Sequence, residues 1–97
     1  MTASTEELLR RSPALIERWT MRRREALEML ALAVRDGDLE GAQLDDLARA
    51  IHRIAGTAGL FGEATFGIRA AHLEHALRRD TPAEERLRLA QEMLAAA

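Results

Sequence analysis

His52 has the most unusual surroundings of the three histidines in this cysteine-free chain. Gly56 follows it by one helical turn and Gly59 by two. A glycine inside a helix costs about 1 kcal/mol relative to alanine, so two glycines beside one histidine need a reason. They could leave the imidazole open to a reacting group on another protein, or they could let a second helix pack closely. The spacing alone leaves both explanations open.

The helix that carries His52 is expected to begin near residues 42–44 and to close at Gly62. Its apolar residues recur at the steps of a buried helix face, namely Leu44, Leu47, Ile51, Ile54, Ala58 and Phe61. At about 100° per residue, His52 lies roughly 120° from the centre of this stripe. We therefore expect His52 to point out of the protein. The residues expected to share its surface are Asp45, Ala48, Arg49, Gly56 and Gly59.

The composition predicts an all-α protein. Hydrophobic residues make up 47% of the 97 residues but aromatic residues only 3%, and alanine and leucine dominate, both of which favour helices. We expect helices over residues 13–35, 63–79 and from 82 onward, besides the one that carries His52. A capping box at Ser4 predicts a further short helix, Ser4 to Arg11. Short connections favour antiparallel neighbours, so we predict one domain, 1–97, that is an up-down-up-down four-helix bundle with the short N-terminal helix at one end.

The expected core follows from the same periodicity in the other helices. One face of each helix is apolar, and the positions expected to point inward are Ile16, Trp19, Ala26 and Leu30, then Phe66, Ala70, Leu73 and Leu77, and finally Leu87, Ala90, Met93 and Leu94.

The segment His52-Arg53-Ile54-Ala55-Gly56-Thr57-Ala58-Gly59-Leu60-Phe61-Gly62 resembles the signature of histidine phosphotransfer (HPt) domains, and Phe66 and the Leu73-Glu74 pair extend the likeness. The resemblance implies that His52 accepts a phosphoryl group from an aspartate of a receiver domain. It also implies that the receiver supplies Mg²⁺ and the acidic cluster, so we expect a non-catalytic carrier without a cofactor. Its expected partners are response-regulator receiver domains or a hybrid histidine kinase. An exposed neutral imidazole is nucleophilic near pH 7, which suits this role.

One position departs from the family pattern. The family often has a lysine three residues after the histidine, where its charge helps to neutralise the phosphoryl group, and here that residue is Ala55. Arg49 or Arg53 could supply the charge, because a guanidinium matches phosphate oxygens well. Arg49 is the preferred candidate because it lies on the same helix face as His52, whereas Arg53 points about 100° further round. The departure also raises an alternative, a binding module of the same fold that docks and inhibits a kinase or receiver without being phosphorylated.

Other classes of function have little support. His72 and His75 lie three residues apart on one helix, but the absence of cysteine favours solvated histidines over a metal site. A net charge of -2, from 14 basic and 16 acidic residues, does not favour nucleic-acid binding. No apolar run is long enough to span a bilayer, and the first residues lack the apolar core of a secretion signal. We therefore expect a cytoplasmic monomer that binds neither nucleic acid nor membrane.

Overall fold

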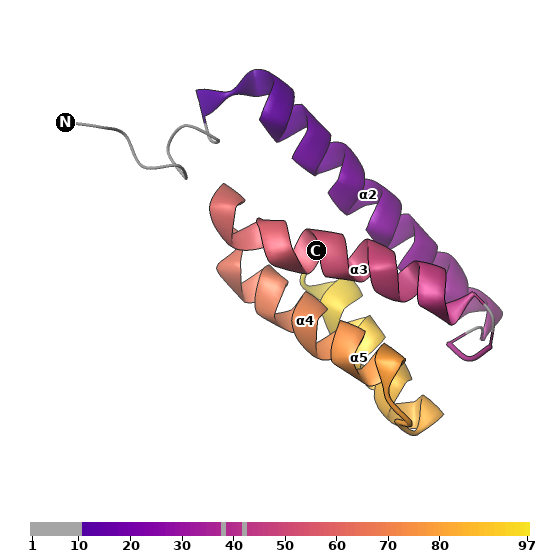
Figure 1. Cartoon of the computed structure of the whole chain (residues 1–97). Helices are drawn as coiled ribbons and strands as arrows, with labels where there is room; N and C mark the ends of the chain where they lie inside the picture. The colour runs from indigo at the N-terminus through magenta and orange to yellow at the C-terminus, as the bar shows by residue number, and fades with distance from the viewer. Residues whose placement is uncertain (1–10, 38, 42) are drawn as a thin grey trace.

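The computed structural model describes residues 11–37, 39–41 and 43–97, and this part of the chain is helical with no strand. Four helices pack together: α2 (Pro13–Asp36), α3 (Leu44–Ala58), α4 (Ala64–Arg78) and α5 (Ala83–Ala95), with a short 3₁₀ helix, η1 (Gly59–Phe61), between α3 and α4. Figure 1 shows α2 as the longest helix, lying along one side of the other three. The all-α prediction is therefore confirmed.

The ends of α2 follow from its sequence. The Ser12 hydroxyl accepts a hydrogen bond from the Leu15 backbone N–H at 3.3 Å, and Pro13 occupies the first helical turn, where its missing N–H has no cost. Gly37 ends the helix with a positive φ of 70°, which is strained for residues with a side chain. The expected helix from Ser4 to Arg11 falls almost wholly outside the described residues.

The helix that carries His52 ends earlier than the apolar periodicity predicts. α3 stops at Ala58, and the chain tightens into η1 before Gly62 turns it with a φ of 80°. The Glu63 N–H then donates to the Ala58 carbonyl at 2.9 Å. Phe61 remains on the inner side through η1, where its ring stacks on Trp19 at a centroid distance of 5.4 Å. The apolar stripe is thus continuous although the helix is not.

A single apolar core fills the space between the helices. Its largest fully buried side chains come from all four of them and are Leu30, Ile51, Ile54, Leu73 and Met93. The expectation for Ile16 is wrong, since this side chain is exposed. With 24 residues α2 is much longer than α3, so its first turns extend beyond the others (Figure 1) and pack against few of the residues that the structure describes.

Leu87 is also exposed, against expectation, because the inner face of α5 is rotated toward Arg86. The Arg86 guanidinium donates to the backbone carbonyls of Ala76, Leu39 and Arg79 at 3.2, 3.1 and 2.6 Å. These bonds satisfy carbonyls at the C-terminal end of α4 and anchor the connection between α2 and α3. The Arg86 side chain therefore lies on the inner side of α5, where periodicity predicts Leu87.

Trp19 is a core residue, as expected, and its indole also fastens α2 to the start of α4. The indole N–H donates to Glu63 Oε2 at 3.0 Å, and Arg23 Nε lies 3.1 Å from both oxygens of the same carboxylate. The Arg23 guanidinium lies 4.5 Å from the centroid of the Phe66 ring, a cation–π distance. This cluster holds the end of the bundle that lies beyond His52 along α3.

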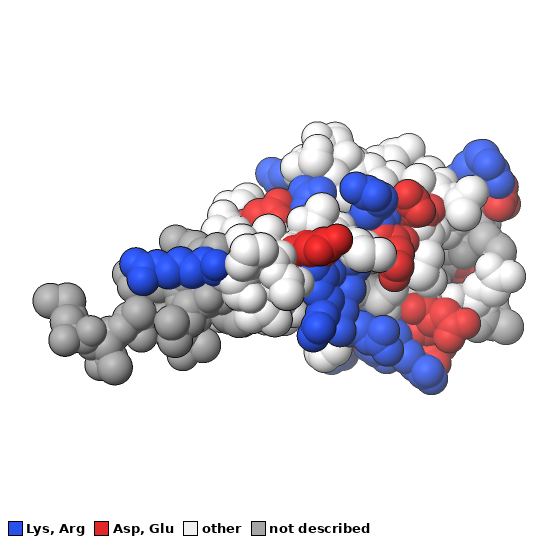
Figure 2. Space-filling view, turned by 90° about the horizontal axis from the view of Figure 1, so that it is seen from above, with Lys and Arg blue, Asp and Glu red and all other residues white. Residues whose placement is uncertain are grey.

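The surface carries charges of both signs. Figure 2 shows basic and acidic side chains interspersed on one face rather than gathered into a single-sign patch. Pairs along the helices contribute to this pattern, such as Arg88 with Glu85 and Glu92 on α5. Among the described helices, none is long and apolar enough to cross a membrane.

Candidate functional site

His52 lies on the outer side of α3, as its position on the helix predicts. Its side chain is 68% exposed, while the neighbouring Ile51 and Ile54 are buried in the core. The two faces of one helix thus separate the reactive group from the residues that hold the helix in place. An imidazole in this position is open to a group on another protein.

Glu74 on α4 holds the imidazole from one side. Its Oε1 lies 2.9 Å from His52 Nδ1, and its side chain is only 18% exposed. An ionised carboxylate can only accept hydrogen bonds, so this contact places a proton on Nδ1. Nε2 is then the ring nitrogen whose lone pair is available in the neutral imidazole. Sequence reasoning noted Glu74 only as part of a family pattern, because a contact between two helices is not visible in the periodicity of either one.

Arg78 binds the other oxygen of the same carboxylate. Its Nε donates to Glu74 Oε2 at 2.8 Å, one helical turn along α4. Partial burial alone would raise the pKa of Glu74, but the hydrogen bonds from His52 and Arg78 outweigh this effect and lower its pKa. Glu74 therefore remains ionised at neutral pH and continues to accept the hydrogen bond from the His52 ring.

The network continues back to α3. Arg78 Nη1 lies 3.8 Å from Asp45 Oδ1, and Arg49 donates to Asp45 Oδ2 at 2.6 Å. Asp45 and Arg49 are both exposed and pair with each other, and Arg49 also lines a groove between α2 and α3. Sequence reasoning missed Arg78; the i,i+4 spacing from Glu74 was the only available signal.

Ala48 requires a correction. It was expected on the surface around His52, but it is only 1% exposed and belongs to the core. The reason is that α4 packs along the flank of α3 on which Ala48 lies, so that this flank is covered although it lies outside the apolar seam. Ala48 therefore cannot contact a docking protein.

Gly56 and Gly59 are both exposed, and a side-chain carbon built at either position would meet no atom within 4 Å. Close helix packing therefore does not explain them. With Ala55, Ala64, Gly67, Ala71, Leu60 and Ile68 they line a shallow hollow of about 440 Å³ between α3 and α4. Neither His52 nor Glu74 lines the hollow, but Gly56 lies one helical turn from His52 and Ala71 about one turn from Glu74. The hollow offers an apolar surface beside an exposed nucleophile.

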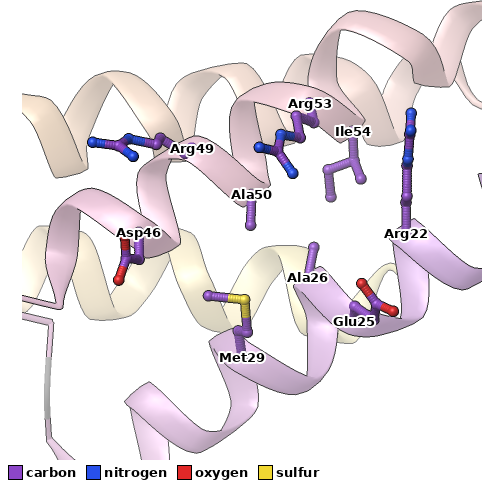
Figure 3. A pocket seen from close by; sticks show the side chains of 9 residues that line it. All are labelled: Arg22, Glu25, Ala26, Met29, Asp46, Arg49, Ala50, Arg53 and Ile54. Carbon is purple, nitrogen blue, oxygen red and sulfur yellow. The ribbon is translucent and has the colours of Figure 1, made fainter.

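Arg53 lies on the opposite flank of α3. Figure 3 shows it among the side chains that line a groove between α2 and α3, opposite Arg22, Ala26 and Met29. The groove has a volume of about 270 Å³. Arg53 is therefore on the α2 side of its helix, whereas Glu74 approaches His52 from the α4 side.

The described residues contain no group of three histidine, cysteine, aspartate or glutamate side chains that could hold a metal ion. His72 and His75 are both exposed on α4. Comparisons of the chain with protein-family models, with curated proteins and with solved structures give no match.

Replacing Glu74 with glutamine is expected to change how stability depends on pH. A carboxyl group whose pKa is lowered in the folded state stabilises the fold above its unfolded pKa of about 4.3, and this contribution disappears as the pH falls through the folded value. The wild-type protein should therefore be more stable than Glu74→Gln at pH 6, and the difference should shrink as the pH falls below about 4.3. Urea unfolding at a series of pH values measures it. The same substitution at the exposed Glu17 is the control, and identical pH profiles for wild type and Glu74→Gln would contradict the expectation.

Proposed function

We propose that this chain is a histidine phosphotransfer domain that carries a phosphoryl group on His52 between receiver-domain aspartates. The observation that carries the proposal is the state of His52. The ring is 68% exposed, its Nδ1 is held by Glu74, and its surface neighbour Gly56 leaves the approach open. A partly exposed imidazole with one nitrogen fixed and the other facing solvent is suited to nucleophilic attack.

In the proposed step the Nε2 lone pair attacks the phosphorus of an aspartyl phosphate on the receiver. The N–P bond forms as the bond between phosphorus and the aspartate oxygen breaks, and the carboxylate leaves with the electron pair. The proton stays on Nδ1, where the Glu74 carboxylate accepts its hydrogen bond. The ring gains positive charge in this step, and the negative charge of Glu74 stabilises it. The Mg²⁺ and the acidic groups of the reaction belong to the receiver, so this domain acts as a carrier rather than an enzyme.

The proposal includes the antiparallel bundle expected from the sequence. Three contacts between α3 and α4 support it: Asp45 with Arg78, His52 with Glu74, and Ala58 with Gly67. Residue numbers rise along α3 as they fall along α4. On this arrangement His52 lies midway along a rigid helix pair, and the hollow beside it receives an apolar part of the receiver. The expected partners are response-regulator receivers or a hybrid histidine kinase, with the domain acting as a cytoplasmic monomer.

The direct test is incubation with a receiver domain carrying a radioactive aspartyl phosphate. Transfer should give a label on this chain that is stable in alkali and labile in acid, as expected for an N–P bond. Mass spectrometry of the intact label should place it on His52. A receiver that binds this chain without transferring its label would instead support the alternative, a docking module that inhibits its partner, because the apolar hollow can serve docking alone.

Replacing Gly56 with leucine is expected to block transfer without loss of stability. The new side chain would extend into open space next to His52 and obstruct the approach of a receiver. Leucine also favours a helix interior over glycine by up to about 1 kcal/mol, so the melting temperature should stay the same or rise. Transfer assays and thermal unfolding on the same samples measure both effects. Transfer at the wild-type rate would show that this surface is not the docking face.

A further inference from the structure

Two carboxylates lie on the surface around His52, the proposed acceptor of a phosphoryl group. Glu74 touches the ring, and Asp45 is linked to Glu74 through Arg78 on the same surface. A bound phosphoryl group adds a charge of about -1.5 to -2, so it would join two carboxylates. Like charges repel, and partial burial of Glu74 strengthens the repulsion. A cation close to His52 is needed to offset it.

Three arginines are candidates, and their contacts distinguish them. Arg49 is 64% exposed and is paired with Asp45 at 2.6 Å, and none of its described contacts reaches Glu74 or His52. Arg53 lies in the groove on the α2 side, which Arg49 also lines, and none of its described side-chain contacts reaches Glu74. Arg78 bonds through its Nε to the Glu74 carboxylate that contacts His52, and its Nη1 lies near Asp45.

We propose that Arg78 is the positioning residue of this site, and that it does the work which Arg49 was expected to do. The inference rests on the proposed transfer through His52. Because Arg78 Nε holds Glu74 Oε2, Oε1 stays directed at His52 Nδ1, which keeps the proton on that nitrogen and leaves Nε2 as the nucleophile. Its positive charge, placed between Glu74 and Asp45, offsets the repulsion that an incoming phosphoryl group meets. A cation from α4 thereby substitutes for the family's lysine at the position of Ala55.

The test compares Arg78→Ala with two matched variants, Arg49→Ala and Arg79→Ala. Arg79 is the next residue, is exposed, and has no contact with Glu74 among the described interactions. The transfer rate is measured in single turnovers at a saturating concentration of phosphorylated receiver. Differences in how fast the two proteins associate then do not affect the rate. Loss of a charged hydrogen bond at a partly exposed site should slow transfer about tenfold in Arg78→Ala, with Arg49→Ala and Arg79→Ala close to the wild type. Arg78→Lys keeps the charge and should restore part of the rate.

A second measurement does not depend on a receiver. Nitrogen-15 NMR of the His52 ring reports which nitrogen carries the proton, and the Nδ1–H form should be less populated in Arg78→Ala than in the wild type or Arg79→Ala. A wild-type transfer rate together with an unchanged tautomer in Arg78→Ala would overturn the inference. A wild-type chain that takes no label would instead contradict the proposed function. In that case a tautomer shift in Arg78→Ala would still support the positioning of the ring by Arg78.

Discussion

His52→Gln is expected to abolish phosphoryl acceptance and to leave the fold intact. Glutamine has no nucleophilic ring nitrogen, so no N–P bond can form. The His52 side chain is largely exposed to solvent, and the amide N–H of glutamine can still donate to Glu74, whose Oε1 accepts the hydrogen bond from Nδ1–H in the wild type. Surface substitutions of this kind usually change the free energy of unfolding by no more than about 0.5 kcal/mol.

The measurement combines label transfer from a phosphorylated receiver with urea unfolding of the same preparation. His72→Gln and His75→Gln are matched controls, since both residues are exposed histidines on α4. Both should accept label at the wild-type rate. If His52→Gln still accepts label while either control does not, the acceptor is on α4 and the proposed role of His52 is wrong.

Gly67→Leu is expected to give the largest loss of stability of any glycine substitution within the helices. A side-chain carbon at Gly67 would lie 3.0 Å from the Ala58 side chain and 3.3 Å from the Ala55 carbonyl oxygen. The carbonyl belongs to the backbone of α3 and cannot move aside without the helix. Inserting extra carbons into such a contact typically costs about 1–3 kcal/mol, which exceeds the gain in helix propensity.

Because α4 also carries Glu74, forcing the two helices apart should weaken the hold on His52 as well. We expect Gly67→Leu to lose both stability in urea and the hydrogen bond between His52 and Glu74, which NMR of the ring would report. Gly56→Leu is the matched control, since the first side-chain carbon at that position meets no atom within 4 Å. A Gly67→Leu protein as stable as the wild type would mean that α3 and α4 approach less closely than described.

The sequence determined which face of each helix is apolar, and much of the architecture follows from it. The stripe that contains Ile51 and Ile54 predicts both a buried side of α3 and an exposed His52 on the other. Pro13, Gly37 and Gly62 mark element ends through their fixed or positive φ, which is a local property of the chain. Such features can be predicted because they depend on residues a few positions apart.

Only the tertiary structure decided what lies against each flank. Ala48, expected at the surface, is buried because α4 covers that side, and Gly67, which no local rule explains, lies where α3 leaves no room for a side chain. The bonds from His52 to Glu74 and from Asp45 to Arg78 join residues more than twenty positions apart. Helical periodicity fixes only the direction in which a side chain points from the axis of its own helix. The partner that it meets depends on where the neighbouring helix lies and how it is rotated, which is set by packing over the whole core.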